Sequence, residues 1–228
     1  MRCCVVIPAR NEAGAVGNVI ERIHATLEAD VIVVDNGSTD ETFSVATAAG
    51  ARVVREVRRG YGYACLAGIA AARDADALVF IDGDGSMAPE EIPVLLAPIE
   101  AGRADIVCGS RRRLRQPGSM PAHQAFGNQL CVTLLRTLYR VRLSDLGPFR
   151  AARATTLHSL HLRPTRFTFL ADMLARGART GARIEEVSIS YGPRIAGRSK
   201  VSGSLRGSIE AGAAILASLA WNRIARID

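Results

Sequence analysis

Short apolar runs alternate with segments of helical character over the first 110 residues, and no other feature of the sequence constrains the fold as strongly. The runs are rich in β-branched and aromatic residues and end in polar or glycine-containing segments, which is typical of buried strands. Strands are predicted at residues 3–7, 31–34, 51–55, 77–82 and 106–108. Strands that alternate with helices predict an α/β fold with a mostly parallel, Rossmann-like sheet that carries helices on both faces.

The segments between these strands carry helix signals. Apolar residues recur with helical spacing over 16–27. Ser38 followed by Glu41 has the pattern of a capping box, which predicts a helix over 39–49 with Gly50 at its C-terminal cap. Further helices are predicted over 64–73, from Pro89, over 125–139, over 167–176 and over 204–227, with a strand at 183–190 and basic loops at 111–124 and 191–202.

Polar residues follow four of the predicted strands. Ligands of parallel α/β sheets bind beyond the carboxyl ends of the strands, so segments that follow different strands should meet at one edge. The segments are Pro8–Glu12, Asp35–Asp40, Asp82–Asp84 and Gly109–Arg111. The sequence therefore predicts a ligand site built from parts of the chain that lie far apart in sequence.

Asp82 and Asp84 follow an apolar run directly and flank Gly83. In an extended chain, residues i and i+2 point the same way, so both carboxylates can face one point. Two converging carboxylates suit a hard divalent cation that keeps waters and bridges substrate phosphates. Gly83 and Gly85 leave room for a ligand to approach closely. The alternative is an acidic Asp-Gly turn, and the convergence of four polar segments favours the metal site.

The chain carries a formal charge of +7, supplied almost entirely by arginine, since Lys200 is the only lysine. Arginine forms bidentate contacts with phosphate, so the excess predicts an anionic partner: a nucleotide, a phospholipid surface or nucleic acid. The alternative explanation is a generally arginine-rich proteome. A basic nucleic-acid-binding protein is disfavoured, because the arginines are scattered over loops and aromatic residues make up only 5% of the chain.

Several other classes of protein lack support in the sequence. Neither a glycine-rich dinucleotide fingerprint nor a P-loop follows the first strand. The five cysteines form no CxxC pair and no Cys/His cluster, which indicates reduced thiols rather than a zinc site. The sequence shows no signal peptide and no run of about 18 apolar residues, so a cytoplasmic protein is expected.

Several segments occur in the same order in a known family. They are Val6–Glu12, Val34–Asp40, Gly60–Gly62, Ala67–Ile69, Phe80–Gly85, Gly109–Arg111, Phe149–Ala151 and Gly197–Lys200. On these segments the chain resembles family 2 glycosyltransferases of the GT-A fold, and among them the polyprenyl- (dolichyl-) phosphate sugar synthases. The resemblance covers nearly the whole chain and implies a single GT-A domain over 1–228. Residues 1–111 would form its nucleotide-sugar-binding half and 112–228 its acceptor-binding half, which ends in an amphipathic helix.

The resemblance implies a UDP- or GDP-sugar donor and a divalent cation. Asp82 and Asp84 match the Asp-x-Asp motif that binds Mg²⁺ or Mn²⁺ on the diphosphate, where the cation neutralises the charge of the leaving group. Arg10 stands where tyrosine is frequent in the synthases, and Ser86 stands where glutamine is common. The implied nucleotide-sugar-binding residues are Pro8, Arg10, Glu12, Asp35, Gly60, Asp82, Gly83, Arg194 and Lys200. The last two fall in the loop that closes over the donor diphosphate.

The predicted catalytic set depends on the acceptor. A lipid phosphate already carries an anionic oxygen and needs no general base, whereas a hydroxyl acceptor requires one. Arg111 and Arg150 match the acceptor-phosphate arginines of the family, and Asp145 is the candidate base for a hydroxyl. Asp84, as a metal ligand, completes the set.

The resemblance implies an inverting transferase that moves one sugar to a polyprenyl phosphate at the cytoplasmic face of the membrane. The alternatives are a soluble family 2 enzyme that acts on a small-molecule or saccharide hydroxyl and, less favoured, a nucleotidyltransferase. The last predicted helix combines arginines with Trp221. It is either a membrane-interface helix, as peripheral attachment requires, or a helix packed on the domain.

Overall fold

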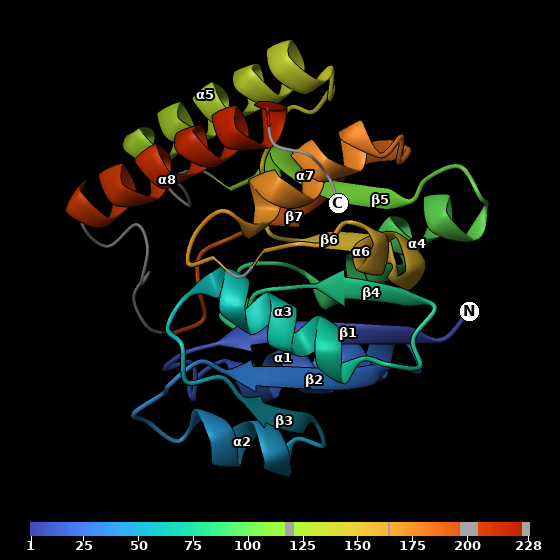
Figure 1. Cartoon of the computed structure of the whole chain (residues 1–228). Coiled ribbons are helices and arrows are strands. Elements are labelled where there is room, and N and C mark those ends of the chain that lie inside the picture. Colours follow the sequence, from blue (N-terminus) through green and yellow to red (C-terminus); the bar gives the residue numbers. More distant parts are fainter. Residues whose placement is uncertain (117–120, 164, 197–204, 225–228) are drawn as a thin grey trace.

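Seven strands form one sheet in the computed structural model, which describes residues 1–116, 121–163, 165–196 and 205–224. Their spatial order is β3-β2-β1-β4-β6-β5-β7 (Figure 1). The strands are β1 (Cys3–Ala9), β2 (Asp30–Asp35), β3 (Arg52–Arg55), β4 (Ala77–Phe80), β5 (Ile106–Arg115), β6 (Arg150–Arg153) and β7 (Ile184–Tyr191). All neighbours pair in parallel except β6, which runs antiparallel to both β4 and β5. The predicted mostly parallel sheet is therefore confirmed.

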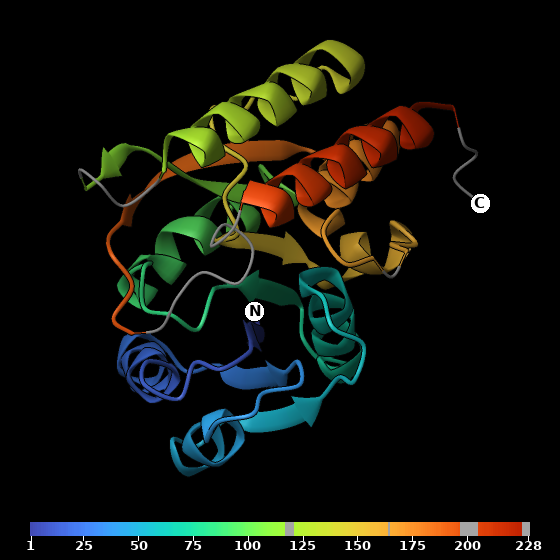
Figure 2. The same cartoon turned by 90° about the vertical axis from the view of Figure 1, so that its left-hand side faces the viewer.

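Helices cover both faces of this sheet (Figures 1 and 2). One face carries α1 (Val16–Thr26), α2 (Thr42–Ala48) and α4 (Ile92–Glu100), the last preceded by the 3-10 turn η1 (Pro89–Glu91). The other face carries α3 (Tyr61–Ala71), α6 (Ala154–Ser159) and α7 (Phe169–Arg179).

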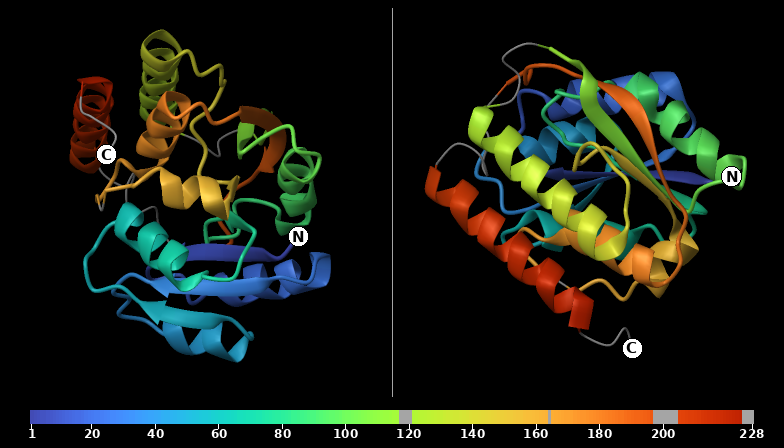
Figure 3. Two further views of the ribbon diagram at one scale, coloured as in Figure 1. Left: turned by 45° about the vertical axis from the view of Figure 1, so that its right-hand side comes forward. Right: turned by 90° about the horizontal axis from the view of Figure 1, so that it is seen from above.

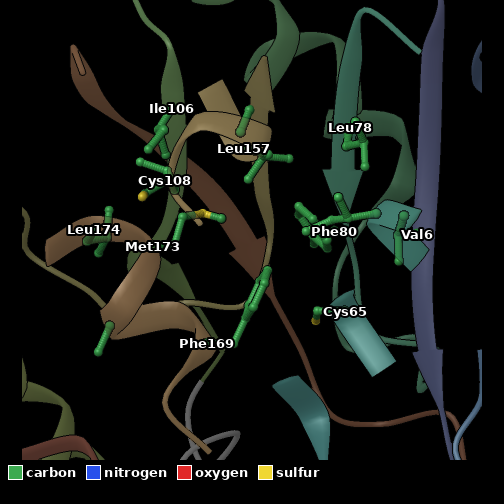
Figure 4. Close-up of a cluster of buried hydrophobic side chains, with 14 of the residues drawn as sticks. Val6, Cys65, Leu78, Phe80, Ile106, Cys108, Leu157, Phe169, Met173 and Leu174 are labelled. Atoms are coloured by element: carbon green, nitrogen blue, oxygen red, sulfur yellow. The ribbon is translucent and has the colours of Figure 1, made fainter. Parts of the chain in front are cut away.

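Apolar side chains on alternating positions of the central strands supply both layers of the core. Val5 and Ile7 of β1 belong to the cluster under α1, α2 and α4, whereas Val6 belongs to the cluster on the opposite face. A strand with apolar residues on both faces is typical of a parallel sheet that is covered on both sides. In the second cluster, Phe80 of β4 packs edge to face on Phe169 of α7, with ring centroids 5.3 Å apart (Figure 4).

Helices α5 (Ala122–Tyr139) and α8 (Leu205–Ile224) lie side by side and pack on α7 (Figure 3). The Tyr139 hydroxyl donates a hydrogen bond to the Leu219 carbonyl, and the Asn222 amide donates one of 2.7 Å to the buried Asp172 carboxylate of α7. These bonds fix the C-terminal half of α8. None of the described helices is both long and apolar enough to span a bilayer.

Two local predictions are wrong. The predicted capping box does not form: α2 begins at Thr42, and the Ser38 hydroxyl instead accepts a hydrogen bond of 3.0 Å from the Asn11 backbone N–H. A hydrogen bond to the loop after β1 thus replaces the capping interaction that the local sequence predicts. The start of the predicted loop at 111–124 is strand, because β5 continues to Arg115 and pairs with β7 after an irregularity between Ser110 and Leu114. The predicted Gly50 cap agrees with its left-handed φ of 92°.

Candidate active site

A cleft of about 720 Å³ lies at the carboxyl edge of the sheet. Its wall combines residues that follow β1, β2, β4 and β7 with residues of β5, α5 and α8. The predicted site residues that line it are Pro8, Arg10, Glu12, Gly60, Asp82, Gly83, Asp84, Arg111 and Arg194. The predicted convergence of strand-end segments at one edge is therefore confirmed. Lys200 lies outside the described residues.

Asp82 and Asp84 form the acidic part of this cleft. One oxygen of Asp84, Oδ1, accepts a hydrogen bond of 2.9 Å from the Ser86 backbone N–H. The other, Oδ2, lies 3.0 Å from Nη2 of Arg194. Burial, followed by the charge of Asp84, raises the pKa of Asp82 from 3.8 to about 7. The two carboxylates therefore repel one another in a setting that would favour a cation between them.

The donor set fits a hard divalent cation such as Mg²⁺ or Mn²⁺. Both candidate ligands are carboxylates, and the buried Ser86 hydroxyl beside them has no hydrogen-bond partner among the described residues. No group of three or more His, Cys, Asp or Glu side chains suited to a metal occurs in the described part of the chain. A cation held here would take its remaining ligands from waters and from substrate phosphate, as Mg²⁺ commonly does.

The raised pKa of Asp82 predicts a pH-dependent metal affinity. The protonated Asp82 contributes stability to the free protein at low pH, and this contribution is lost as the pH rises through about 7. The cation binds the ionised form of Asp82, so the affinity of the protein for the cation increases as the pH rises. We expect Mg²⁺ to bind about tenfold more tightly at pH 8 than at pH 6, the ratio of the ionised fractions. Titration calorimetry at both pH values measures this change.

Asp82→Asn is the control for that titration. The variant lacks the titrating carboxyl, so its residual Mg²⁺ affinity should vary much less between pH 6 and pH 8. An equal pH dependence in the wild type and the variant would show that another group is responsible.

Two loops that follow β1 and β2 form part of the cleft wall. The Glu12 backbone N–H donates to the Thr42 hydroxyl at 2.8 Å, which ties the loop after β1 to α2. Asn36 donates from its side-chain amide to the Arg58 carbonyl at 2.8 Å and accepts from the Gly60 N–H at 2.7 Å. Asn36 lines the cleft and was missed by the sequence reasoning. The predicted Asp35 is not part of the lining, and its carboxylate accepts the Ser38 N–H at 3.0 Å.

Gly60 is required by a close approach of two loops. Its φ is 150°, and a Cβ atom at this position would lie 2.7 Å from the Cα of Arg166. A Cβ atom at Gly62 would lie 2.3 Å from the Thr165 carbonyl oxygen. The two glycines thus let the segment before α7 pack against the start of α3, which brings Arg166 into the wall of the cleft.

Arg111 is the most firmly held cation of the cleft. It sits where the pairing of β5 and β7 is irregular, a feature that often re-aims side chains beside active sites. Its Nε and Nη2 donate to the two carboxylate oxygens of Asp145 at 2.7 and 2.8 Å. The guanidinium also lies 5.1 Å from the centre of the Tyr191 ring. The side chain therefore presents its remaining N–H groups from a fixed position.

The structure pairs Asp145, the candidate base for a hydroxyl acceptor, with Arg111. Burial would raise the pKa of Asp145, but the hydrogen bonds and charge of Arg111 outweigh burial and hold this pKa below its usual value. Both oxygens of the carboxylate are engaged by Arg111, and Asp145 does not belong to the cleft lining. Asp145 therefore holds the Arg111 guanidinium in place.

Glu186 supports the pair of Asp145 and Arg111, and it was not predicted from the sequence. Its carboxylate accepts the backbone N–H groups of Ser144 and Asp145 at 2.7 and 3.1 Å, and the Ser144 hydroxyl at 2.8 Å. It therefore fixes the turn that presents Asp145. Glu186 stands opposite Cys108 in the pairing of β5 with β7. The only sequence signal was its position three residues after the start of an alternating strand.

The structure also corrects the placement of Arg150. Its side chain is fully buried, with Nε donating to the Gly147 carbonyl at 2.7 Å and Nη1 to the Leu170 carbonyl at 2.8 Å. It is absent from the cleft lining. Arg150 thus links the turn before β6 to α7 and does not reach the ligand space.

Arg150→Met is expected to destabilise the protein by about 3 kcal/mol, because it leaves two buried carbonyl groups without their donor. The change in the free energy of unfolding can be measured by urea titration. Arg112→Met is the matched control, because Arg112 is exposed on β5. A loss below about 1 kcal/mol at Arg150 would contradict this structural role.

Apolar side chains from α5, α7, α8 and the turn before β6 contribute to the lining, and we call them the apolar wall of the cleft. They are Cys131, Leu146, Pro148, Leu170, Ala211 and Ile215. Gly127 of α5 and Gly212 of α8 also face this space, and a Cβ atom at either would meet no atom within 4 Å. The lining of the cleft therefore combines an acidic pair, several arginines and apolar side chains.

Comparisons with known proteins agree with this geometry. The model of the family described as Glycosyl transferase family 2 matches residues 4–157. An uncharacterized glycosyltransferase of Mycobacterium tuberculosis is 42% identical over 205 residues, which cover 90% of this chain and 92% of that protein. An undecaprenyl-phosphate mannosyltransferase of Micrococcus luteus is 34% identical over 224 residues, which cover 91% of this chain and 90% of that protein.

A solved structure resembles the whole fold. Glucosyl-3-phosphoglycerate synthase from Mycobacterium tuberculosis, in complex with Mn²⁺, UDP and phosphoglyceric acid, superimposes with a TM-score of 0.79 and 28% sequence identity. The match covers 99% of this chain and 79% of that protein.

Proposed function

The chain belongs to glycosyl transferase family 2, and we propose that it is a metal-dependent enzyme that transfers one sugar, with inversion, from a UDP- or GDP-sugar to a polyprenyl phosphate. The observation that carries this proposal is that one cleft is lined by the Asp82–Asp84 pair, by Arg111 and by apolar residues of α5, α7 and α8. A phosphate held by Arg111 would share this cleft with a metal-bound diphosphate and with apolar surface.

The chemistry follows from the charge of the acceptor. In an inverting transfer, a phosphate oxygen forms a bond to the anomeric carbon while the bond from that carbon to the nucleoside diphosphate breaks. A phosphate oxygen is already an anion, so the protein needs only to hold it in line. This requirement matches a site in which Asp145 is committed to Arg111 and leaves no base at that position.

Asp82 and Asp84 would hold Mg²⁺ or Mn²⁺, which when bound neutralises charge on the departing diphosphate. One relative supports a divalent cation beside the diphosphate. The synthase of known structure was crystallised with Mn²⁺ and UDP, and its acceptor, phosphoglyceric acid, also carries a phosphate. We infer that residues 1–111 supply the donor site and residues 112–228 the acceptor site.

A lipid acceptor is favoured over a small one by exposed apolar side chains on α5 and α8, two helices that contribute to the apolar wall. Phe126 and Leu130 of α5 and Trp221 and Ile224 of α8 are exposed. Arg136 of α5 is exposed as well, with further exposed arginines at the ends of both helices. Apolar side chains beside arginines suit the interface of an anionic membrane. We propose that this face of α5 and α8 makes peripheral contact with the cytoplasmic leaflet.

Incubation with labelled UDP-glucose or GDP-mannose, Mn²⁺ and one of two acceptors tests the proposal. We expect label to enter the organic phase with a polyprenyl phosphate, and no transfer to 3-phosphoglyceric acid. Transfer to 3-phosphoglyceric acid alone would overturn the lipid acceptor while leaving the transferase activity intact. No transfer with either acceptor, together with no thermal stabilisation by UDP or GDP, would overturn the donor assignment.

A further inference from the structure

We propose that Arg194 is an internal counter-cation of the metal site, which holds Asp84 in the ligand-free protein and releases it when a divalent cation arrives with a nucleoside diphosphate. The inference rests on the proposed donor site. It adds that this chain binds its cation weakly without nucleotide, and that one residue sets this dependence.

Arg194 contacts two of the acidic residues of the cleft. Its Nη2 lies 3.0 Å from Oδ2 of Asp84, and its Nη1 lies 3.4 Å from Oε1 of Glu12. Both carboxylates are buried, and the arginine side chain is 28% exposed. The guanidinium therefore supplies positive charge to a cluster in which Asp82 is a third carboxyl, close enough for Arg194 to lower its pKa against the stronger effect of burial.

The backbone delivers Arg194 to this position. The Ile195 N–H donates to the Asp84 carbonyl and the Gly192 N–H to the Ser86 carbonyl, both at 2.9 Å. Tyr191 forms an isolated antiparallel bridge with Met87. The segment that carries Arg194 thus runs along the loop that carries Asp84. The ion pair is a consequence of this pairing and not of a long side chain that happens to reach the site.

The guanidinium and a divalent cation compete for the same atom. Oδ1 of Asp84 already accepts the Ser86 N–H, so Oδ2 is the oxygen best placed to bind a cation. Two positive groups on one oxygen repel one another. A metal ion that binds alone must therefore displace Arg194 from Asp84, which leaves the guanidinium with its longer contact of 3.4 Å to Glu12.

A nucleoside diphosphate removes this cost. Its phosphate oxygens offer the displaced guanidinium a bidentate partner, and they also coordinate the cation. Cation and nucleotide then strengthen each other's binding, and by linkage the effect is the same in both directions. Arg194 makes the site selective for the metal–diphosphate complex over the cation alone or the nucleotide alone.

Mn²⁺ binding to the full chain, measured by the electron paramagnetic resonance signal of the free ion, tests this inference. We expect UDP or GDP, whichever stabilises the wild type, to tighten Mn²⁺ binding on the order of tenfold or more. In Arg194→Gln, Mn²⁺ alone should bind on the order of tenfold more tightly than to the wild type, and the gain from nucleotide should shrink.

Two further variants separate the contact from the charge. Arg59→Gln removes a cation that lines the same cleft, and we expect it to change the affinity for Mn²⁺ alone much less than Arg194→Gln does. Arg194→Lys keeps the charge but loses the fork that reaches both carboxylates. Its affinity for Mn²⁺ alone should therefore lie between those of the wild type and Arg194→Gln.

Two results would overturn the counter-cation role while leaving the donor site in place. One is an unchanged or weaker affinity of Arg194→Gln for Mn²⁺ alone, in a variant whose thermal unfolding shows an intact fold. The other is an undiminished gain from nucleotide in that variant. If no nucleotide binds to the wild type at any Mn²⁺ concentration, the proposed function fails and the inference fails with it.

Discussion

Asp84→Asn is expected to lower turnover on the order of a thousandfold, the largest effect of any single substitution in the cleft. The change keeps the shape of the side chain and the acceptor for the Ser86 N–H, but it removes the negative charge that Arg194 and a divalent cation share. The leaving diphosphate would then depart with its charge uncompensated. Initial rates at saturating donor and acceptor measure the loss.

A binding measurement shows whether the loss arises at the metal. The thermal shift produced by UDP with Mn²⁺ should disappear in Asp84→Asn, whereas the melting temperature of the free variant should remain close to that of the wild type. Asp74→Asn, at an exposed turn residue, is the matched control and should behave as wild type. Full activity in both Asp82→Ala and Asp84→Ala would contradict the assignment of the metal site.

Arg111→Ala is expected to lower kcat/KM for the acceptor on the order of a hundredfold. The two hydrogen bonds to Asp145 and the ring of Tyr191 fix this guanidinium. Its remaining N–H groups are therefore already oriented when a phosphate binds. The thermal shift with UDP and Mn²⁺ should persist, because Arg111 is proposed to act on the acceptor. Acceptor kinetics at saturating donor measure the change.

Two substitutions on the same strand sharpen this test. Arg111→Lys should recover only part of the activity, because an ammonium group cannot form the two bonds to Asp145. Arg112→Ala removes the same charge one residue further along β5, where the side chain is exposed, and should leave kcat/KM within about twofold. Equal losses in Arg111→Ala and Arg112→Ala would point to a general effect of positive charge.

The proposed donor end of the cleft could be predicted from the sequence because its signals are local. An apolar run followed at once by Asp82 and Asp84 specifies both the strand and the edge at which the carboxylates emerge. The same logic placed Glu12 and the loop after β2. In that loop, the residue that lines the cleft is Asn36, one position beyond the predicted Asp35. A sequence shows that a polar segment leaves the sheet, but not which of two adjacent side chains faces the ligand.

The proposed acceptor end could not be predicted in the same way because its contacts join distant segments. Arg111 and Asp145 are 34 residues apart, and the partner of each could be identified only once β5 and the turn before β6 were placed together. Arg150 resembled a ligand-binding arginine, yet its guanidinium serves two carbonyl groups in the interior. The apolar wall takes one residue each from α5 and α7 and two each from α8 and the turn before β6, so no extended periodic pattern marks it.

The antiparallel strand β6 has a consequence for the order in which the protein is made. Strands β5 and β7 connect to the other strands only through β6, which pairs with Ala77–Phe80 on one side and Ile106–Cys108 on the other. A nascent chain that has not yet produced Arg150 therefore has an unpaired edge at β4, and it cannot join its two halves. Synthesis completes the donor strands well before the strand that joins them to the acceptor side. Until then the exposed edge needs protection from pairing with other chains.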